Sequence, residues 1–126
     1  MKPAELNPFK IGYGDEMIVF YPRMAMDAEL DEVNKKFLDV SDTDELQYEK
    51  LFNIRLEAIA EFSALSPKRM TKEKGEIKYV ELVDGAETTL DAMKRYFDKR
   101  TGESEKIIRT AYNAIINSMS PTIDFL

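Results

Sequence analysis

The spacing of apolar residues changes several times along the chain, and each spacing predicts a different element. Near the N-terminus, the apolar segments "FKIGY" and "EMIVFY" lie on either side of Gly14–Asp15. Glycine and aspartate favour the backbone angles of a tight hairpin turn. We therefore predict a small N-terminal β-hairpin. Its second strand should end at Pro22, because proline cannot donate a hydrogen bond to a neighbouring strand.

Four later segments carry apolar residues three or four positions apart, which is the spacing of an amphipathic helix. The expected helices span residues 26–38, 42–64, 88–99 and 104–119. At the start of the first, the acidic residues from Asp27 to Glu32 match the positive end of the helix dipole. At the start of the third, Thr88 with Asp91 three residues later resembles a capping box.

The helix expected over 42–64 carries a wide apolar surface, which predicts contact with more than one other element. Ser41 and Asp44 resemble a capping box at its start, and Ser66–Pro67 is expected to end it. One stripe of this surface consists of Leu51, Ile54, Ala58, Phe62 and Leu65. The neighbouring stripe consists of Phe52, Leu56 and Ile59.

The remaining segments complete the expected architecture. Residues 67–76 are basic and polar and predict a mobile loop, whereas "EIKYVELV" over 76–83 alternates in part and favours a third strand. Residues 1–8 predict an N-terminal arm, and residues 121–126 an apolar C-terminal tail. We therefore expect residues 1–126 to form a single domain of the α+β class, mostly helical, with four helices and a small β element.

The apolar positions of these elements also predict the core. Each expected core residue lies on the apolar side of its strand or helix. The expected core residues are Ile18, Phe20, Leu30, Val33, Phe37, Leu51, Ile54, Ile59, Phe62, Leu90, Phe97, Ile108, Ala111 and Ile115.

Composition narrows the chemistry that the domain could carry. The 126 residues include no cysteine and no histidine. Disulfides, thiolate metal ligands and the most common general acid–base side chain are therefore excluded. The longest apolar run is far shorter than the roughly 20 residues of a membrane-spanning helix, and no apolar signal core follows the N-terminus. We expect a cytoplasmic protein with no membrane segment and no cofactor.

The net charge of −6 is unevenly distributed between the two halves of the chain. Residues 1–63 carry 7 basic and 14 acidic side chains, whereas residues 64–126 carry 11 basic and 10 acidic ones. The acidic half opposes contact with nucleic acid phosphates. The helices at 88–99 and 104–119 nevertheless have a connector close in length to that of a helix-turn-helix motif. A DNA-binding regulator is therefore an alternative function, although the acidic "GESEK" would face phosphate.

Two acidic clusters, "DAELDE" and "DTDELQYE", raise the question of a cation site, because Ca²⁺ and Mg²⁺ take carboxylate oxygens. The calcium-loop pattern needs glycine at its sixth position and glutamate at its twelfth. In "DVSDTDELQYEK" these positions hold aspartate and lysine. Both clusters also lie where helix starts normally carry acids. A carboxylate–metal enzyme is therefore only a second alternative, and we expect neither a metal site nor an enzyme.

Two methionines mark the place where the strand ending at Pro22 meets the first helix. Methionine adapts its shape and suits surfaces that bind partner helices, although filling a core is its more common use. Met24 and Met26 are therefore candidate partner-binding residues. Further candidates come from the apolar stripes of the helices and from the basic segment. The full set is Met24, Met26, Leu30, Phe37, Phe52, Leu56, Lys68 and Arg69.

Residues 9–65 resemble the small tail assembly chaperones of long-tailed bacteriophages. Those proteins often begin with a strand carrying a "V-x-F-x-P" run, followed by an acidic helix and a longer helical hairpin. Here "IVFYPRMAMDAELDEV" provides Phe20, Pro22 and the acids from Asp27 to Glu32, and "YEKLFNIRLEAIAEF" follows. Ile18 stands where the run usually has valine.

The resemblance implies a non-enzymatic assembly or adaptor protein in the cytoplasm of a bacterial host. Its partner would be a long helical tape-measure protein, or another tail or capsid component, which it keeps soluble until assembly. An acidic protein suits that role, because it could cover apolar helix stripes while its charge discourages precipitation. A homo-oligomer is compatible with this function.

Overall fold

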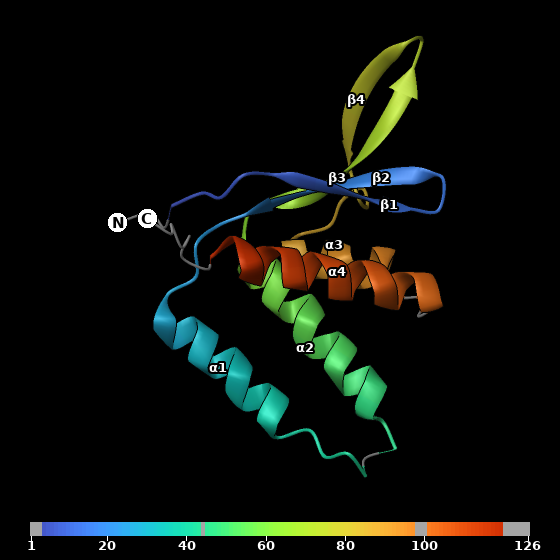
Figure 1. Ribbon diagram of the computed structural model, residues 1–126. Coiled ribbons are helices and arrows are strands. Elements are labelled where there is room, and N and C mark those ends of the chain that lie inside the picture. Colours follow the sequence, from blue (N-terminus) through green and yellow to red (C-terminus); the bar gives the residue numbers. More distant parts are fainter. Residues whose placement is uncertain (1–3, 44, 98–100, 120–126) are drawn as a thin grey trace, which may run out of the picture.

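The structure is a computed structural model that describes residues 4–43, 45–97 and 101–119. In these residues the chain forms four strands and four helices (Figure 1). In chain order they are β1 (Phe9–Tyr13), β2 (Glu16–Pro22), α1 (Asp27–Leu38), α2 (Gln47–Glu61), β3 (Ser63–Glu73), β4 (Glu76–Glu81), α3 (Thr89–Tyr96) and α4 (Gly102–Ser118).

The strands of the described residues form one antiparallel sheet in the order β1-β2-β3-β4. The predicted hairpin joins β1 to β2, and Gly14 has the positive φ of 60° that the first residue of a type II′ turn requires. Lys74 and Gly75 join β3 to β4 with φ angles of 51° and 81°, as in a type I′ turn. Both turn types match the twist of the strands they connect, so the sheet continues across them.

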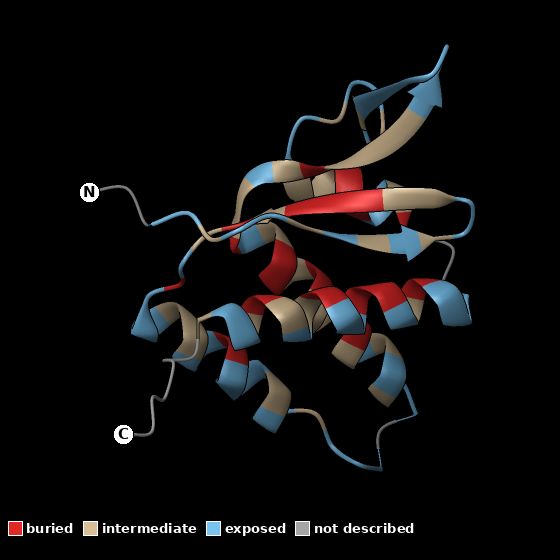
Figure 2. Cartoon of the chain, turned by 45° about the horizontal axis from the view of Figure 1, so that its top comes forward, coloured by how far each residue is buried: buried red, intermediate tan, exposed pale blue. Residues whose placement is uncertain are grey.

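The helices of the described residues lie on one side of this sheet (Figure 1). α3 contacts β3 and α4 contacts β1, so these two helices form the layer next to the strands. α2 contacts both α3 and α4, and α1 contacts α2 at the periphery. The opposite side of the sheet carries no helix in the part of the chain that is described (Figures 1 and 2).

The core lies between the sheet and the helices, where the buried residues gather in Figure 2. Nine of the core residues expected from the sequence are buried: Ile18, Phe20, Val33, Ile59, Phe62, Phe97, Ile108, Ala111 and Ile115. The other five are only half-buried, because they lie where a helix surface turns towards solvent: Leu30, Phe37, Leu51, Ile54 and Leu90.

The α+β class, the N-terminal hairpin and the four helices are confirmed, but the expectation of a mostly helical chain is wrong. Helix accounts for 46% of the described residues and strand for 28%. The mobile basic loop expected over 67–76 is also wrong, since most of it belongs to β3 and its hairpin turn. Charged residues have low strand propensity, but Lys68 and Arg69 pair with β2 on one side and β4 on the other. Pairing on both edges overrides the local preference.

The second helix ends earlier than the sequence predicted. α2 stops at Glu61, and the Ser63 hydroxyl donates to the carbonyl oxygen of Ile59 at 2.5 Å. Ser63 is also the first residue of β3, where it pairs with Pro22 of β2. The residues after Phe62 therefore belong to the sheet, and Ser66–Pro67 lies inside a strand instead of ending a helix.

The two apolar stripes expected on the second helix are buried to different extents. The stripe that is buried along its whole length consists of Phe52, Leu56 and Ile59. In the other stripe Ala58 and Phe62 are buried, whereas Leu51 and Ile54 are half-buried. Its last member, Leu65, lies on β3 with 58% of its surface exposed. Periodicity identified the apolar positions, but the placement of the neighbouring elements decided which side became the core.

The other helices begin and end close to their expected residues, because local capping groups define them. The Thr88 hydroxyl accepts a hydrogen bond from the Asp91 N–H at 3.0 Å, and the Thr101 hydroxyl accepts one from the Ser104 N–H at 3.2 Å. Part of the N-terminal arm runs beside the β2–α1 junction through a bridge between Glu5 and Arg23. The tail over 121–126 and Asp44 of the expected capping box lie outside the described residues.

Candidate protein-interaction surface

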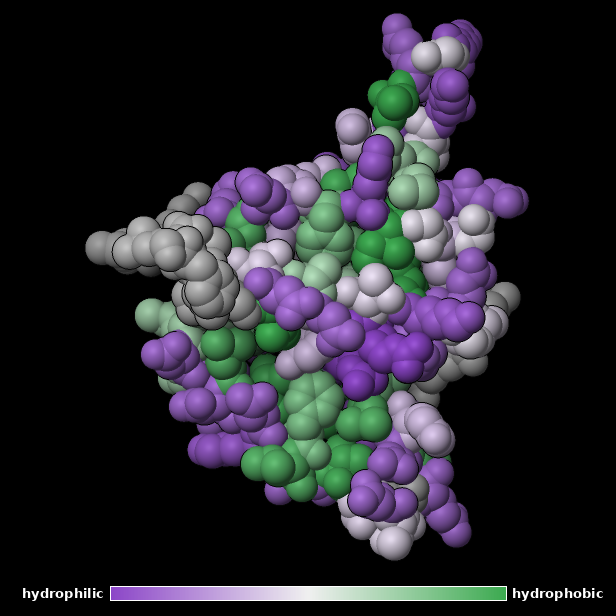
Figure 3. All heavy atoms as spheres, in the orientation of Figure 1, coloured by the Kyte–Doolittle hydropathy of each residue, from purple (hydrophilic) through white to green (hydrophobic). Residues whose placement is uncertain are grey.

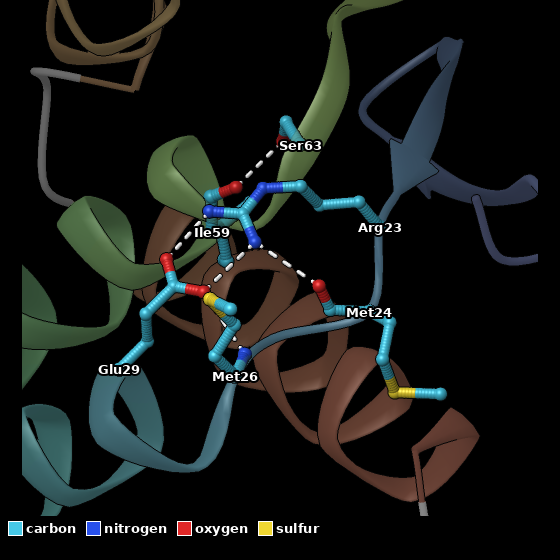
Figure 4. Close-up of polar contacts among 6 residues, drawn as sticks. All are labelled: Arg23, Met24, Met26, Glu29, Ile59 and Ser63. Carbon is cyan, nitrogen blue, oxygen red and sulfur yellow. Dashed lines mark hydrogen bonds and ion pairs between the residues drawn. The ribbon is translucent and has the colours of Figure 1, made fainter. Parts of the chain in front are cut away.

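The junction between β2 and α1 is held by an ion pair. Arg23 follows β2, and Glu29 lies in the first turn of α1. The Arg23 Nη1 and Nη2 atoms donate to the Glu29 Oε1 and Oε2 atoms at 3.0 and 2.6 Å (Figure 4). This is the bidentate geometry that makes arginine–carboxylate pairs strong. The two side chains are only 18% and 20% exposed, so water weakens their interaction less than it does at the surface.

Further contacts connect this ion pair to the core and to the start of the helix. The Arg23 guanidinium lies 5.6 Å from the centre of the Phe62 ring, which is within cation–π range. The Arg23 backbone N–H donates to the Phe62 carbonyl oxygen at 2.9 Å. The Glu29 carboxylate also accepts from the Met26 N–H at 2.9 Å, one of the groups that a helix leaves unpaired at its start. β2, α1 and the end of α2 therefore fix the junction together.

These hydrogen bonds stabilise the charged form of Glu29. The bond from Arg23 is the largest cause and the bond from the Met26 N–H is the second, and the pKa of Glu29 falls from 4.5 to about 2. In the unfolded chain the carboxyl keeps its ordinary pKa, so the unfolded chain binds this proton first as the pH falls. The contribution of Glu29 to stability is therefore present above about pH 4.5 and is lost as the pH falls towards 2.

This linkage gives a prediction for acid unfolding. Glu29→Gln should lower the free energy of unfolding at pH 7 by about 1–2 kcal/mol, because the neutral amide loses the ion pair and has only one oxygen to accept the two hydrogen bonds from Arg23. The difference from the wild type should shrink as the pH falls from 4.5 to about 2. Urea unfolding at constant ionic strength across this range measures it. Glu32→Gln, at a mostly exposed carboxylate of the same helix, is the matched control and should keep the wild-type slope.

Met24 and Met26 lie on either side of Ala25 at this junction, and both side chains are accessible. They are 37% and 67% exposed, and the Met24 side chain extends away from the ion pair in Figure 4. The backbone beneath them is held in place, since the Met24 N–H donates to the Ala4 carbonyl oxygen at 2.7 Å. Exposed apolar side chains on an ordered backbone favour binding, because little conformational entropy remains to be lost.

Four of the other candidate residues belong to the helical layer. Leu30 and Phe37 are half-buried and pack against the core, and the Phe37 ring centre lies 5.6 Å from that of Tyr112. Phe52 and Leu56 are only 4% and 2% exposed. The expectation that these two bind a partner is wrong, because they are enclosed in the core of the folded chain.

The last two candidate residues are neighbours on β3, and side chains of neighbouring strand residues point to opposite faces of a sheet. Arg69 lies on the helical side, where its Nη1 atom donates to the Glu16 Oε1 atom at 3.3 Å. The Tyr96 hydroxyl of α3 donates to the other oxygen of Glu16 at 2.6 Å. Lys68 therefore points to the side without helices, so the structure does not bring the pair together at one site.

An apolar surface that was not predicted from the sequence lies on the side of the sheet that carries no described helix. Ile18 and Phe20 point into the core, so the residues that alternate with them on β2 point the other way. Their partners on β3 and β4 extend this surface across the sheet. We call it the outer sheet face and define it by Met17, Val19, Tyr21, Leu65, Met70 and Tyr79. None of the six belongs to the core cluster.

A two-residue alternation in the sequence could have indicated this surface. The apolar residues Ile77 and Tyr79 are separated by Lys78, and Met70 lies between polar residues. That pattern becomes informative only when residues 63–73 are recognised as a strand, because the alternation of strand side chains then places Met70 and Tyr79 on one face. The basic composition of the segment concealed it.

Neither alternative function gains geometric support. In the described residues no group of three or more histidine, cysteine, aspartate or glutamate side chains lies close enough to hold a metal ion. The start of α4, which a helix-turn-helix protein would present to DNA, is hydrogen-bonded to the β1–β2 hairpin. The Tyr13 and Ser104 hydroxyls lie 2.7 Å apart, and the Gly14 N–H donates to the Glu103 carboxylate at 2.5 Å. Glu103 is exposed at this end of α4, and its negative charge opposes contact with DNA phosphates.

Comparison of the chain with protein-family models, with curated proteins and with solved structures finds no match in any of the three. The likeness to tail assembly chaperones therefore stays a prediction from the sequence pattern. Within the described ranges, no helix has both the length and the apolar character needed to cross a membrane.

Proposed function

We propose that this protein is a non-enzymatic assembly or adaptor protein, similar in role to the tail assembly chaperones that residues 9–65 resemble. The observation that carries the proposal is the exposure of Met24 and Met26 beside the ion pair between Arg23 and Glu29. The partner we propose is a helical segment of a tape-measure-like protein or of another tail or capsid component.

Both the shape and the charge of this protein suit such a partner. A partner helix presents side chains at intervals of three or four residues, and flexible methionine side chains can fill the spaces between them. The ion pair keeps the junction in place, so binding does not have to order it first. The net charge of −6 keeps the complex soluble while the apolar stripe of the partner is covered.

Co-expression with candidate tail and capsid components tests this proposal, read by affinity pull-down and by light scattering of the partner. The double variant Met24→Ser/Met26→Ser should reduce binding about tenfold or more, because it removes two apolar contacts. Serine is a favoured N-cap residue, so the change at Met26 should not weaken α1. Thermal unfolding monitored by circular dichroism checks that the fold is retained.

Leu38→Ser/Tyr48→Ser provides the matched control, since these side chains are 84% and 81% exposed but lie away from the junction. This control should bind like the wild type. If no tail or capsid component binds the wild-type protein, the proposed function is wrong. If the control loses binding while the Met24→Ser/Met26→Ser variant keeps it, the junction is not the binding surface.

A further inference from the structure

The outer sheet face exposes large apolar side chains, which the free face of a sheet in a two-layer domain normally does not. An antiparallel sheet with one face on a core normally presents alternating polar residues to water on the other face. Here Leu65 and Tyr79 are 58% and 53% exposed, and Ile77, on the same face further along β4, is 57% exposed. Val19, which lies on β2 between Tyr21 and Met17, is only 7% exposed although it lies outside the core cluster.

The dimensions of this surface suit a helix. Its apolar residues follow β3 from Leu65 to Met70, with Lys68 between them, and end at Ile77 of β4, which pairs with Lys72. At about 3.3 Å per residue, the segment from Leu65 to Lys72 spans about 23 Å. An α-helix of about 15 residues has the same length. A helix lying along the strands would thus add a third layer on the uncovered face of the sheet.

The charge of the outer sheet face is opposite to that of the whole chain. Lys10 and Lys68 lie on either side of Val19 in the sheet, and Lys72 lies at the far end. Glu81, which pairs with Lys68, is the acidic residue on this face within β1 to β4. The three lysines form no ion pair with any described residue. A chain of net charge −6 thus presents an apolar surface with unpaired positive charge at its centre and at its ends.

We propose that the outer sheet face is a second docking surface, which binds an amphipathic helix whose apolar stripe is flanked by acidic residues. The apolar stripe would cover Leu65, Met70 and Tyr79, and its flanking carboxylates would meet Lys10, Lys68 and Lys72. A second copy of this chain placed face to face would instead bring lysines against lysines, which opposes binding. The surface uses none of the junction residues, so the proposal stands apart from the function proposed above.

Three synthetic peptides of about 16 residues test this proposal against the full chain. The first has leucines at positions i, i+3, i+4 and i+7 with glutamates flanking them. The second replaces the glutamates with lysines, and the third has the composition of the first but no stripe. Fluorescence anisotropy of labelled peptides should show that the first binds at least about tenfold more tightly than the other two.

Two variants locate the binding site. Leu65→Ser/Tyr79→Ser should weaken binding of the acidic peptide about tenfold or more, because both exposed apolar contacts are lost. Lys68→Glu/Lys72→Glu should reverse the preference in favour of the lysine-flanked peptide. Leu38→Ser/Tyr48→Ser is the matched control and should leave the affinity unchanged, whereas Met24→Ser/Met26→Ser shows whether the peptide binds at the junction instead. All four variants carry changes at exposed or half-buried positions, and circular dichroism confirms that each is folded.

The result that overturns the proposal can take several forms. Equal affinity for the acidic and lysine-flanked peptides would remove the charge argument. Undiminished binding to Leu65→Ser/Tyr79→Ser would place the peptide elsewhere, and loss of binding in Met24→Ser/Met26→Ser would place it at the junction. Absence of peptide binding together with a concentration-dependent dimer, abolished by Leu65→Ser/Tyr79→Ser, would show that a second copy occupies this surface. Absence of both would also count against the proposal.

Discussion

Phe62→Ala should lower the free energy of unfolding by about 3–5 kcal/mol, the largest effect that we expect from a single substitution in this chain. The Phe62 side chain has 0% of its surface exposed and lies where α2 ends and β3 begins. Alanine would leave a cavity at this point and would remove the ring that faces the Arg23 guanidinium. Because domains of this size are typically stable by only about 5–15 kcal/mol, the variant should be close to unfolding.

Urea unfolding monitored by circular dichroism measures this loss. Phe62→Leu is the matched control, and it should cost less than about 2 kcal/mol because most of the buried volume remains. Tyr48→Ala, at a side chain that is 81% exposed, should change stability by less than about 0.5 kcal/mol. A loss below about 1 kcal/mol for Phe62→Ala would contradict the enclosed position of this ring.

Arg23→Ala should cost about 2–3 kcal/mol, the second largest effect. The substitution removes both hydrogen bonds to Glu29, the bond to the Met24 carbonyl oxygen and the contact with the Phe62 ring. It also leaves the Glu29 carboxylate, which is 20% exposed, without its cation. Arg23→Lys should recover only part of the loss, because a lysine ammonium cannot form the bidentate pair.

A double-mutant cycle with Glu29→Gln isolates the ion pair. The coupling free energy between the two positions should be about 1–2 kcal/mol in urea unfolding at pH 7. The exposed pair of Lys78 and Glu73 is a fitting control, because its side chains are 53% and 60% exposed and its coupling should stay below about 0.5 kcal/mol. A coupling near zero for Arg23 and Glu29 would mean that the ion pair does not hold the junction.

The sequence by itself determined the elements whose signals are local. The first hairpin follows from Gly14–Asp15 and from the apolar segments beside it, and its turn needs only the residues that form it. The starts of α3 and α4 are set by threonine caps within one helical turn. Such signals act over a few residues, so a single sequence contains all the information that they require.

The tertiary structure decided which apolar residues are buried and where the second helix ends. A helical period predicts that Phe52, Leu51 and Leu65 lie on the apolar side of a helix. It does not say which neighbouring helices or strands will cover them. β3 forms because its residues pair with β2, which lies far upstream in the chain, and with β4. Since that pairing is non-local, no property of residues 63–73 alone could have predicted it.

The candidate binding surfaces also differ in how far the sequence alone could predict them. The sequence identified Met24 and Met26, because a strand ending at Pro22 beside an acidic helix start is a local pattern. The assignment of Phe52 and Leu56 to a binding surface failed, since burial depends on the packing of α2 against α3 and α4. The outer sheet face exists only because strands far apart in sequence place their alternating apolar side chains side by side. Exposure of an apolar residue is a property of the assembled fold, and it is therefore the part that the sequence could not determine.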